Sequence, residues 1–185
     1  MNLANKVSTF RILSVPFFIA SILYYDSNHQ YLRWVALAIF LAAVISDAID
    51  GFIARTSKQH SSAGLILDPL GDKLLLISAF ICLYFVSFPI RFPLFVVFIV
   101  ISRDLLIILG VVVLFMVKQR IDIRPTWWGK LTTTFQMLSV ISILLQLKIS
   151  FIFWSIAIIF TIISGIDYIV KGFKLLYAND NHISS

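Results

Sequence analysis

The sequence has few charged residues and almost no cysteine. Charged side chains make up 13% of its 185 residues, while hydrophobic residues make up 60%. A soluble domain of this size has too little interior to hide that much apolar surface. The single cysteine, Cys82, permits no intrachain disulfide, and it lies in an apolar run, where we expect a small core residue. The composition therefore predicts an integral membrane protein.

Glutamate is absent from the chain. The nine acidic residues are all aspartates, and four of them stand between residues 47 and 72. Lys and Arg total 15, which gives a formal net charge of +6. Because the basic residues flank apolar segments, we expect them to meet anionic phosphate groups and membrane lipids, and we expect no nucleic-acid partner.

The four aspartates belong to one patterned stretch, DAIDGFIARTSKQHSSAGLILDPLGD, at residues 47–72. Its first half has an i, i+3, i+4, i+7 spacing and its second half an i, i+4, i+8 spacing, and each marks one face of an α-helix. If the two helices pack side by side, the carboxylates converge, and four like charges then need cations to stay ionised. The patterned residues are Asp47, Asp50, Gly51, Ala54, Arg55, Gly64, Asp68 and Asp72.

The residue types in this stretch favour a two-metal site. Ligand sets made only of oxygen suit Mg²⁺ or Mn²⁺, and no His or Cys stands in the stretch at zinc-ligand spacing. Two such ions about 3.5–4 Å apart would hold a phosphoryl group for in-line displacement. Gly51, Ala54 and Gly64 would let a bulky ligand approach the backbone, and Arg55 would act as a bidentate phosphate donor.

The pattern D-x2-D-G-x2-A-R-x8-G-x3-D-x3-D resembles the signature of the CDP-alcohol phosphatidyltransferases, and every specified position is present. The run LDPLGDKLL at 67–75 is similar to the phosphatidylglycerophosphate synthase branch, which usually has Ala where this chain has Gly71. The resemblance implies a six-helix membrane enzyme, usually a homodimer. Such an enzyme moves a phosphatidyl group from CDP-diacylglycerol to an alcohol and releases CMP.

The resemblance also implies roles for individual residues. Asp47, Asp50 and Asp68 would be the principal metal ligands, and Asp72 would be the general base and touch the second metal. The opening segment is similar to N-P-N-x-L-T-x2-R, with Ala4 in place of the usual Pro. The residues that would form the CDP site are Asn5, Gly51, Ala54, Arg55 and Gly64.

The acceptor alcohol is less clearly specified by the sequence. The run WGKLTTTFQM resembles the G-K-x-K-T-x2-Q stretch of phosphatidylglycerophosphate synthases, but Thr132 replaces the second Lys. Three basic residues, Arg103, Arg124 and Lys130, suggest a phosphate-bearing acceptor, and we expect glycerol 3-phosphate. The run SRDLLI resembles the cardiolipin synthase branch, whose acceptor is phosphatidylglycerol. The neighbouring pair of Arg103 and Asp104 is either a buried packing pair or part of a wet acceptor pocket.

The apolar segments predict an all-α, polytopic chain with six transmembrane helices. We expect a short N-terminal interfacial helix and one domain over 1–185, with a disordered tail at about 176–185. Most Lys and Arg residues lie on the side of the N-terminus, which predicts cytosolic termini and a cytosolic aspartate cluster in a bacterial inner membrane. The predicted spans are about 8–25, 32–55, 64–87, 94–117, 130–147 and 150–174.

Two other classes of protein use intramembrane aspartates. Prenyltransferases also bind Mg²⁺ through Asp-rich motifs, but they typically have more helices and motifs of the N-D-x2-D type. A cation transporter would place its acids near the membrane midplane between internal repeats. In this chain the acids lie at one end of the apolar segments and no repeat is visible, so an enzyme of phosphatidyl transfer is favoured.

Overall fold

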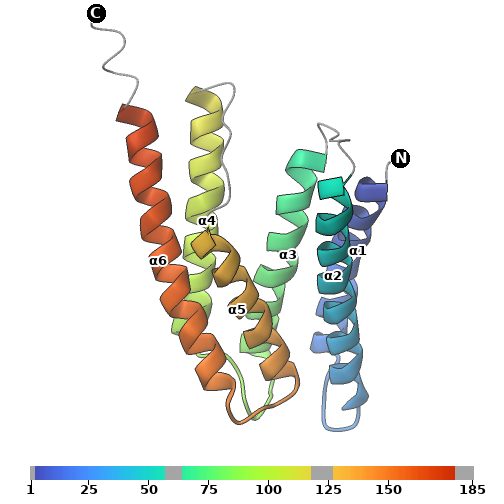
Figure 1. Cartoon of the computed structure of the whole chain (residues 1–185). Coiled ribbons are helices and arrows are strands. Elements are labelled where there is room, and N and C mark those ends of the chain that lie inside the picture. Colours follow the sequence, from blue (N-terminus) through green and yellow to red (C-terminus); the bar gives the residue numbers. More distant parts are fainter. Residues whose placement is uncertain (1–2, 57–63, 118–126, 178–185) are drawn as a thin grey trace, which may run out of the picture. The chain divides into compact units, whose positions relative to one another are not determined.

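The computed structural model describes the backbone of residues 3–56, 64–117 and 127–177, and the side chains of residues 11–46, 73–110 and 127–171. Within these ranges all regular secondary structure is α-helical, and six helices follow one another along the chain (Figure 1). This confirms the all-α prediction. The helices are α1 (Leu3–Leu23), α2 (Tyr31–Thr56), α3 (Gly64–Phe85), α4 (Leu94–Val117), α5 (Trp127–Leu144) and α6 (Ser150–Tyr177).

The first helix differs from the sequence prediction. A separate interfacial helix was expected before a span at about 8–25, but α1 runs without a break from Leu3 to Leu23. Residues 3–11 contain neither Pro nor Gly, so nothing in that segment interrupts the backbone hydrogen bonds. Pro16 lies inside the same helix, which continues on both sides of it.

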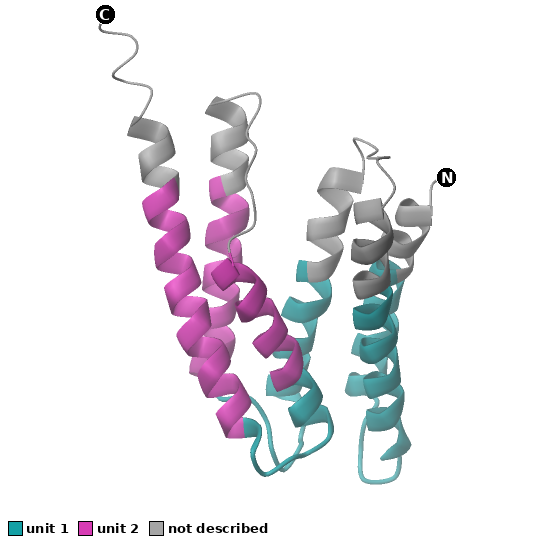
Figure 2. Ribbon diagram, viewed as in Figure 1, with its two compact units in different colours: residues 1–93, 140–150 teal, residues 94–139, 151–185 magenta. Residues whose placement is uncertain are grey.

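The chain divides into two compact units (Figure 2), and each is described by itself. Unit 1 comprises residues 1–93 and 140–150, and unit 2 comprises residues 94–139 and 151–185. In unit 1, α1 packs against both α2 and α3. Large aromatic side chains fill the core of unit 1. The rings of Phe18 on α1 and Phe40 on α2 lie 6.0 Å apart, and Phe80 on α3 stacks at 4.5 Å on Phe92 in the following connection. All four rings are buried.

Apolar side chains also cover much of the outside of the helices. Phe98, Leu109 and Ile166 are each more than half exposed. Among the described residues, the segment Ser150–Lys171 is long and apolar enough to cross a membrane by length and composition. Shorter apolar helical segments are Arg11–Leu23, Tyr31–Ser46 and Lys73–Phe85.

In unit 2, α4 and α6 approach closely at a glycine. The Tyr168 hydroxyl on α6 donates a hydrogen bond to the Ile107 carbonyl on α4 at 3.3 Å. A Cβ atom built on Gly110 would lie 2.8 Å from the Tyr168 ring, which is closer than real Cβ atoms come. The absence of a side chain at residue 110 therefore sets how near the two helices lie.

In unit 1, the side chain of Gln146 forms hydrogen bonds that join two connections between helices. Gln146 lies between α5 and α6, and its Oε1 accepts a hydrogen bond from the Ile90 amide while its Nε2 donates to the Ile90 carbonyl, each at 3.0 Å. Its Nε2 also lies 2.7 Å from the Ile143 carbonyl. The backbone of Gln146 has a φ of 56°, which is uncommon for a residue other than Gly. The amide thus ties the α3–α4 connection to the α5–α6 turn.

We predict that Gln146→Gly lowers the stability of the protein even though Gly relaxes the positive φ. The substitution leaves the Ile90 amide and carbonyl without the partner that they now have, at a cost of about 1–3 kcal/mol. Thermal unfolding of the purified protein in detergent measures the effect, and Gln146→Ala should be less stable still because it keeps the backbone strain. A Gly variant as stable as the wild type would contradict this role.

We also predict that Gly110→Ala destabilises unit 2. The added methyl group must push the Tyr168 ring, which is stiff and held at its hydroxyl end, so a loss of about 1–3 kcal/mol is expected for overpacking. In the double variant with Tyr168→Ala the same methyl group should cost much less, because the ring is gone. Equal costs in both backgrounds, measured by thermal unfolding, would show that the ring is not what the methyl group meets.

Candidate functional site

The patterned aspartates lie on two consecutive helices of unit 1. Asp47, Asp50, Gly51, Ala54 and Arg55 fall in the last three turns of α2, and Gly64, Asp68 and Asp72 fall in the first three turns of α3. The helical backbone places Asp47 and Asp50 on one face of α2 and Asp68 and Asp72 on one face of α3, as the spacing predicted. The side chains of all eight residues lie outside the described residues, and so does that of Asn5.

Helix α1 brings a buried positive charge into the same unit. Arg11 is only 3% exposed, and α1 packs against both helices that carry the motif. Burial of a cation is costly unless opposite charge or hydrogen bonds compensate it. In the sequence, Arg11 is the last residue of the opening segment that is similar to N-P-N-x-L-T-x2-R, and that pattern does not reveal its burial.

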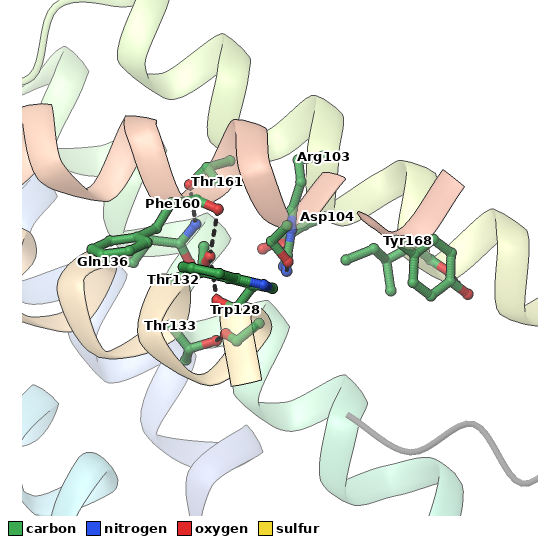
Figure 3. Close-up of polar contacts among 12 residues, drawn as sticks. Arg103, Asp104, Trp128, Thr132, Thr133, Gln136, Phe160, Thr161 and Tyr168 are labelled. Carbon is green, nitrogen blue, oxygen red and sulfur yellow. Dashed lines mark hydrogen bonds and ion pairs between the residues drawn. The ribbon is translucent and has the colours of Figure 1, made fainter. Parts of the chain in front are cut away.

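The interior of unit 2 is unusually polar for an apolar bundle (Figure 3). Arg103 and Asp104 on α4 are 7% and 0% exposed, and Arg103 Nη1 donates to Asp104 Oδ1 at 2.7 Å. Arg103 Nη2 donates to the hydroxyl of Ser164 on α6 at 2.5 Å. Among the described residues, nothing accepts a hydrogen bond from the buried Nε of Arg103. The guanidinium is therefore held on two nitrogens and open on the third.

Helices α5 and α6 meet along a second set of polar side chains (Figure 3). The buried Thr132 hydroxyl lies 2.9 Å from the Phe160 carbonyl on α6 and 2.8 Å from the Trp128 carbonyl on α5. Gln136 Nε2 donates to the Thr161 hydroxyl at 3.3 Å. Thr132 thus occupies the position of the expected second Lys with a small side chain that packs into the helix contact rather than a free cation.

The three basic residues predicted to bind the acceptor lie in different surroundings. Arg103 is buried, as described above, whereas Lys130 is exposed at the start of α5 with its Nζ 6.0 Å from the centre of the Trp127 ring. Trp127 is itself 79% exposed. Arg124 lies outside the described residues. Of the three, Arg103 alone is seen in a polar interior.

The sequence alone did not single out the polar residues of α6 that contact α4 and α5. Thr161 and Ser164 are three residues apart, which places both on one face of the helix, and both are buried. Two polar residues on one face of an otherwise apolar helix were the only sign in the sequence that this face of α6 makes polar contacts. Ser164 contacts Arg103, 61 residues away in sequence, and Thr161 contacts Gln136, 25 residues away. No local pattern reveals either contact.

Comparison with known proteins agrees with the motif. A family model described as CDP-alcohol phosphatidyltransferase matches residues 1–163. A CDP-diacylglycerol--glycerol-3-phosphate 3-phosphatidyltransferase of Aquifex aeolicus is 33% identical, over 96% of this chain and 99% of its own length. A protein with the same description from Haemophilus influenzae is 32% identical, over 92% of this chain and 94% of its own length.

A Mycobacterium tuberculosis protein described as "Probable phosphatidylglycerophosphate synthase" is 32% identical, over 94% of this chain and 82% of its own length. These matches extend far beyond the 26 residues of the motif and reach across both units of the structure. On the family match and on the extent of these identities, the chain belongs to the CDP-alcohol phosphatidyltransferase family.

Proposed function

We propose that the protein transfers a phosphatidyl group from CDP-diacylglycerol to glycerol 3-phosphate, forming phosphatidylglycerophosphate and releasing CMP. The observation that carries the proposal is the complete eight-residue motif on two consecutive helices of a family member. The relatives from Aquifex aeolicus and Haemophilus influenzae are named for this reaction. Phosphatidyl transfer explains why four carboxylates are kept on the ends of apolar helices.

The donor set fits divalent cations bound through oxygen. Asp47, Asp50, Asp68 and Asp72 supply carboxylates on one face of each of two helical segments, which suits Mg²⁺ or Mn²⁺. Two such ions would neutralise the diphosphate charge of CDP-diacylglycerol. Among the described side chains, no group of three or more His, Cys, Asp or Glu residues is close enough to hold a metal ion. We place the proposed metal site at the motif because its spacing puts two carboxylates on one face of each helix.

The remaining motif residues would bind the nucleotide and move a proton. Asp72 takes the proton of the acceptor hydroxyl as that oxygen attacks the β-phosphorus. The bond from the β-phosphorus to the oxygen shared with the α-phosphate breaks, and CMP leaves with that oxygen. Arg55 binds phosphate oxygens through its planar fork. Small residues leave space for the CDP group, and the proposed CDP site is Asn5, Gly51, Ala54, Arg55 and Gly64.

We place the acceptor phosphate at Arg103, with Arg124 and Lys130 as further basic residues. Arg103 supports this placement because its guanidinium is buried and its Nε carries no hydrogen bond within the described structure. The run SRDLLI favours one alternative, cardiolipin synthesis with phosphatidylglycerol as the acceptor. Both reactions use the same donor and release the same nucleotide, so the acceptor alone distinguishes them.

The proposed setting is a bacterial inner membrane crossed six times. The helices have between 18 and 28 residues, and at about 1.5 Å per residue each reaches across most or all of a hydrocarbon core of roughly 30 Å. The surplus of Lys and Arg on the side of the N-terminus supports cytosolic termini and a cytosolic motif. We further propose one functional domain over 1–185, with a disordered tail at about 176–185, that works as a homodimer.

An acceptor panel tests the reaction. The purified protein in mixed micelles with CDP-diacylglycerol should release CMP on addition of glycerol 3-phosphate, and the lipid product identified by mass should be phosphatidylglycerophosphate. Phosphatidylglycerol, inositol phosphate and glycerol serve as the other acceptors. If CMP release requires phosphatidylglycerol and glycerol 3-phosphate gives none, the cardiolipin alternative replaces this proposal.

Two aspartate variants separate the base from the metal ligands. Asp72→Asn should lower single-turnover CMP release by roughly 10²–10⁴-fold, the usual cost of losing a general base, while metal-dependent binding of CDP-diacylglycerol survives. Asp68→Asn should weaken that binding itself, because the diphosphate is held through the metals. EDTA should abolish wild-type activity, and added Mg²⁺ or Mn²⁺ should restore it.

The outcomes that contradict these roles are distinct. Full activity in EDTA would remove the metal site. Near wild-type turnover of Asp72→Asn would show that another group takes the proton. A loss of binding in Asp72→Asn as large as in Asp68→Asn would make Asp72 chiefly a metal ligand.

A further inference from the structure

We propose that Ser164 is the positioning residue that makes Arg103 selective for a phosphate-bearing acceptor. The inference rests on the proposed function, in which Arg103 binds the acceptor phosphate. It adds a residue on another helix that fixes the orientation of the Arg103 guanidinium. Ser164 does not touch the reacting atoms. Its effect would reach the acceptor through Arg103.

The two bonds that hold the Arg103 guanidinium come from different helices. Asp104 is the next residue on α4 and accepts from Nη1 at 2.7 Å, so it moves with Arg103 whenever α4 moves. Ser164 stands on α6 and accepts from Nη2 at 2.5 Å. Figure 3 shows Arg103 and Asp104 lying together beside α6. The bond to Ser164 therefore fixes the plane of the guanidinium relative to a second helix.

This arrangement leaves one nitrogen of the guanidinium without any hydrogen-bond partner in the described structure. The Nε of Arg103 is buried and, in the described structure, no oxygen accepts its hydrogen bond. An unsatisfied buried donor costs stability, and such groups in native proteins call for a specific explanation. A phosphate typically binds arginine through two parallel N–H groups. With one N–H of Nη1 on Asp104 and one of Nη2 on Ser164, Nε–H and one N–H on each Nη remain, and a phosphate can use Nε–H together with one of these.

The open donor also favours a phosphate over an uncharged alcohol. The Arg103 and Asp104 pair has no net charge, so the preference comes from the Nε–H of Arg103 and not from the net charge of the pair. A phosphate at Nε satisfies the open donor and interacts strongly in an interior of low dielectric constant, whereas a hydroxyl acceptor such as glycerol has no anionic oxygen to place there. Holding the guanidinium still therefore matters most for the phosphorylated acceptor.

Ser164→Ala removes the hydroxyl and tests this role. The KM for glycerol 3-phosphate should rise by roughly 10-fold, since a hydrogen bond to a charged group is lost and the guanidinium can rotate. The KM for CDP-diacylglycerol should stay within about twofold of the wild type, and kcat should change little. Ser164→Thr keeps a hydroxyl at the same position and should restore the lower KM. A purely structural role for Ser164 would not produce this difference between the two substrates.

Gly165→Ala is the matched control. A Cβ at residue 165 would lie 3.6 Å from Cγ of Arg103, which is ordinary van der Waals contact. The substitution thus changes packing against the same side chain without removing a hydrogen bond. We expect the KM values for both substrates to stay within about twofold of the wild type.

A binding measurement separates this inference from the proposed reaction. Glycerol 3-phosphate and inorganic phosphate should each raise the thermal unfolding temperature of the wild type, and Ser164→Ala should lose most of that shift. If the wild type uses glycerol 3-phosphate but Ser164→Ala has an unchanged KM, the inference fails and the reaction stands. If the wild type transfers only to phosphatidylglycerol but its phosphate-induced shift still depends on Ser164, the reaction fails and the phosphate contact stands. If neither transfer nor a shift occurs, both are wrong.

Discussion

The interior of unit 2 depends on the compensation of one buried positive charge. Arg103 lies among apolar helices and is held by Asp104 on its own helix and by Ser164 on α6. Because a buried cation without partners is costly, these contacts constrain how α4 and α6 lie against each other. The hydroxyl of Tyr168 bonds α4 one turn further on with the same sequence offset of 61 residues, as expected for two parallel helices. Thr132 and Gln136 then join α5 to the same helix at Phe160 and Thr161.

Much of the fold could be predicted because it depends on local properties of the chain. Uninterrupted apolar runs between polar turns gave the six helices, with most ends correct to within a few residues. The aspartate pattern gave the helical character of 47–56 and 64–72 because a period near 3.6 residues is visible without knowledge of any contact. The family match then replaced the prenyltransferase and transporter alternatives with phosphatidyl transfer.

The parts that could not be predicted depend on residues that are distant in sequence. Ser164 and Thr161 look like isolated polar residues in an apolar helix until α4 and α5 are placed beside them. Gln146 looks like an ordinary turn residue until Ile90 is seen at its amide group. The continuous α1 differs from the prediction for another reason. The polar side chains near the N-terminus are typical of an interfacial segment, but residues 3–11 contain no helix-breaking residue, so the helix continues through them.

The bond between Gln146 and Ile90 has a consequence for the order in which the chain can be completed. The two residues are separated by 56 positions, and a ribosome makes the earlier one first. The Ile90 amide and carbonyl therefore cannot gain this partner until α4 and α5 have been synthesised and the turn after α5 has emerged. Unit 1 remains unfinished for the whole time that the first half of unit 2 is being made, and its closure is a late event in the biogenesis of the protein.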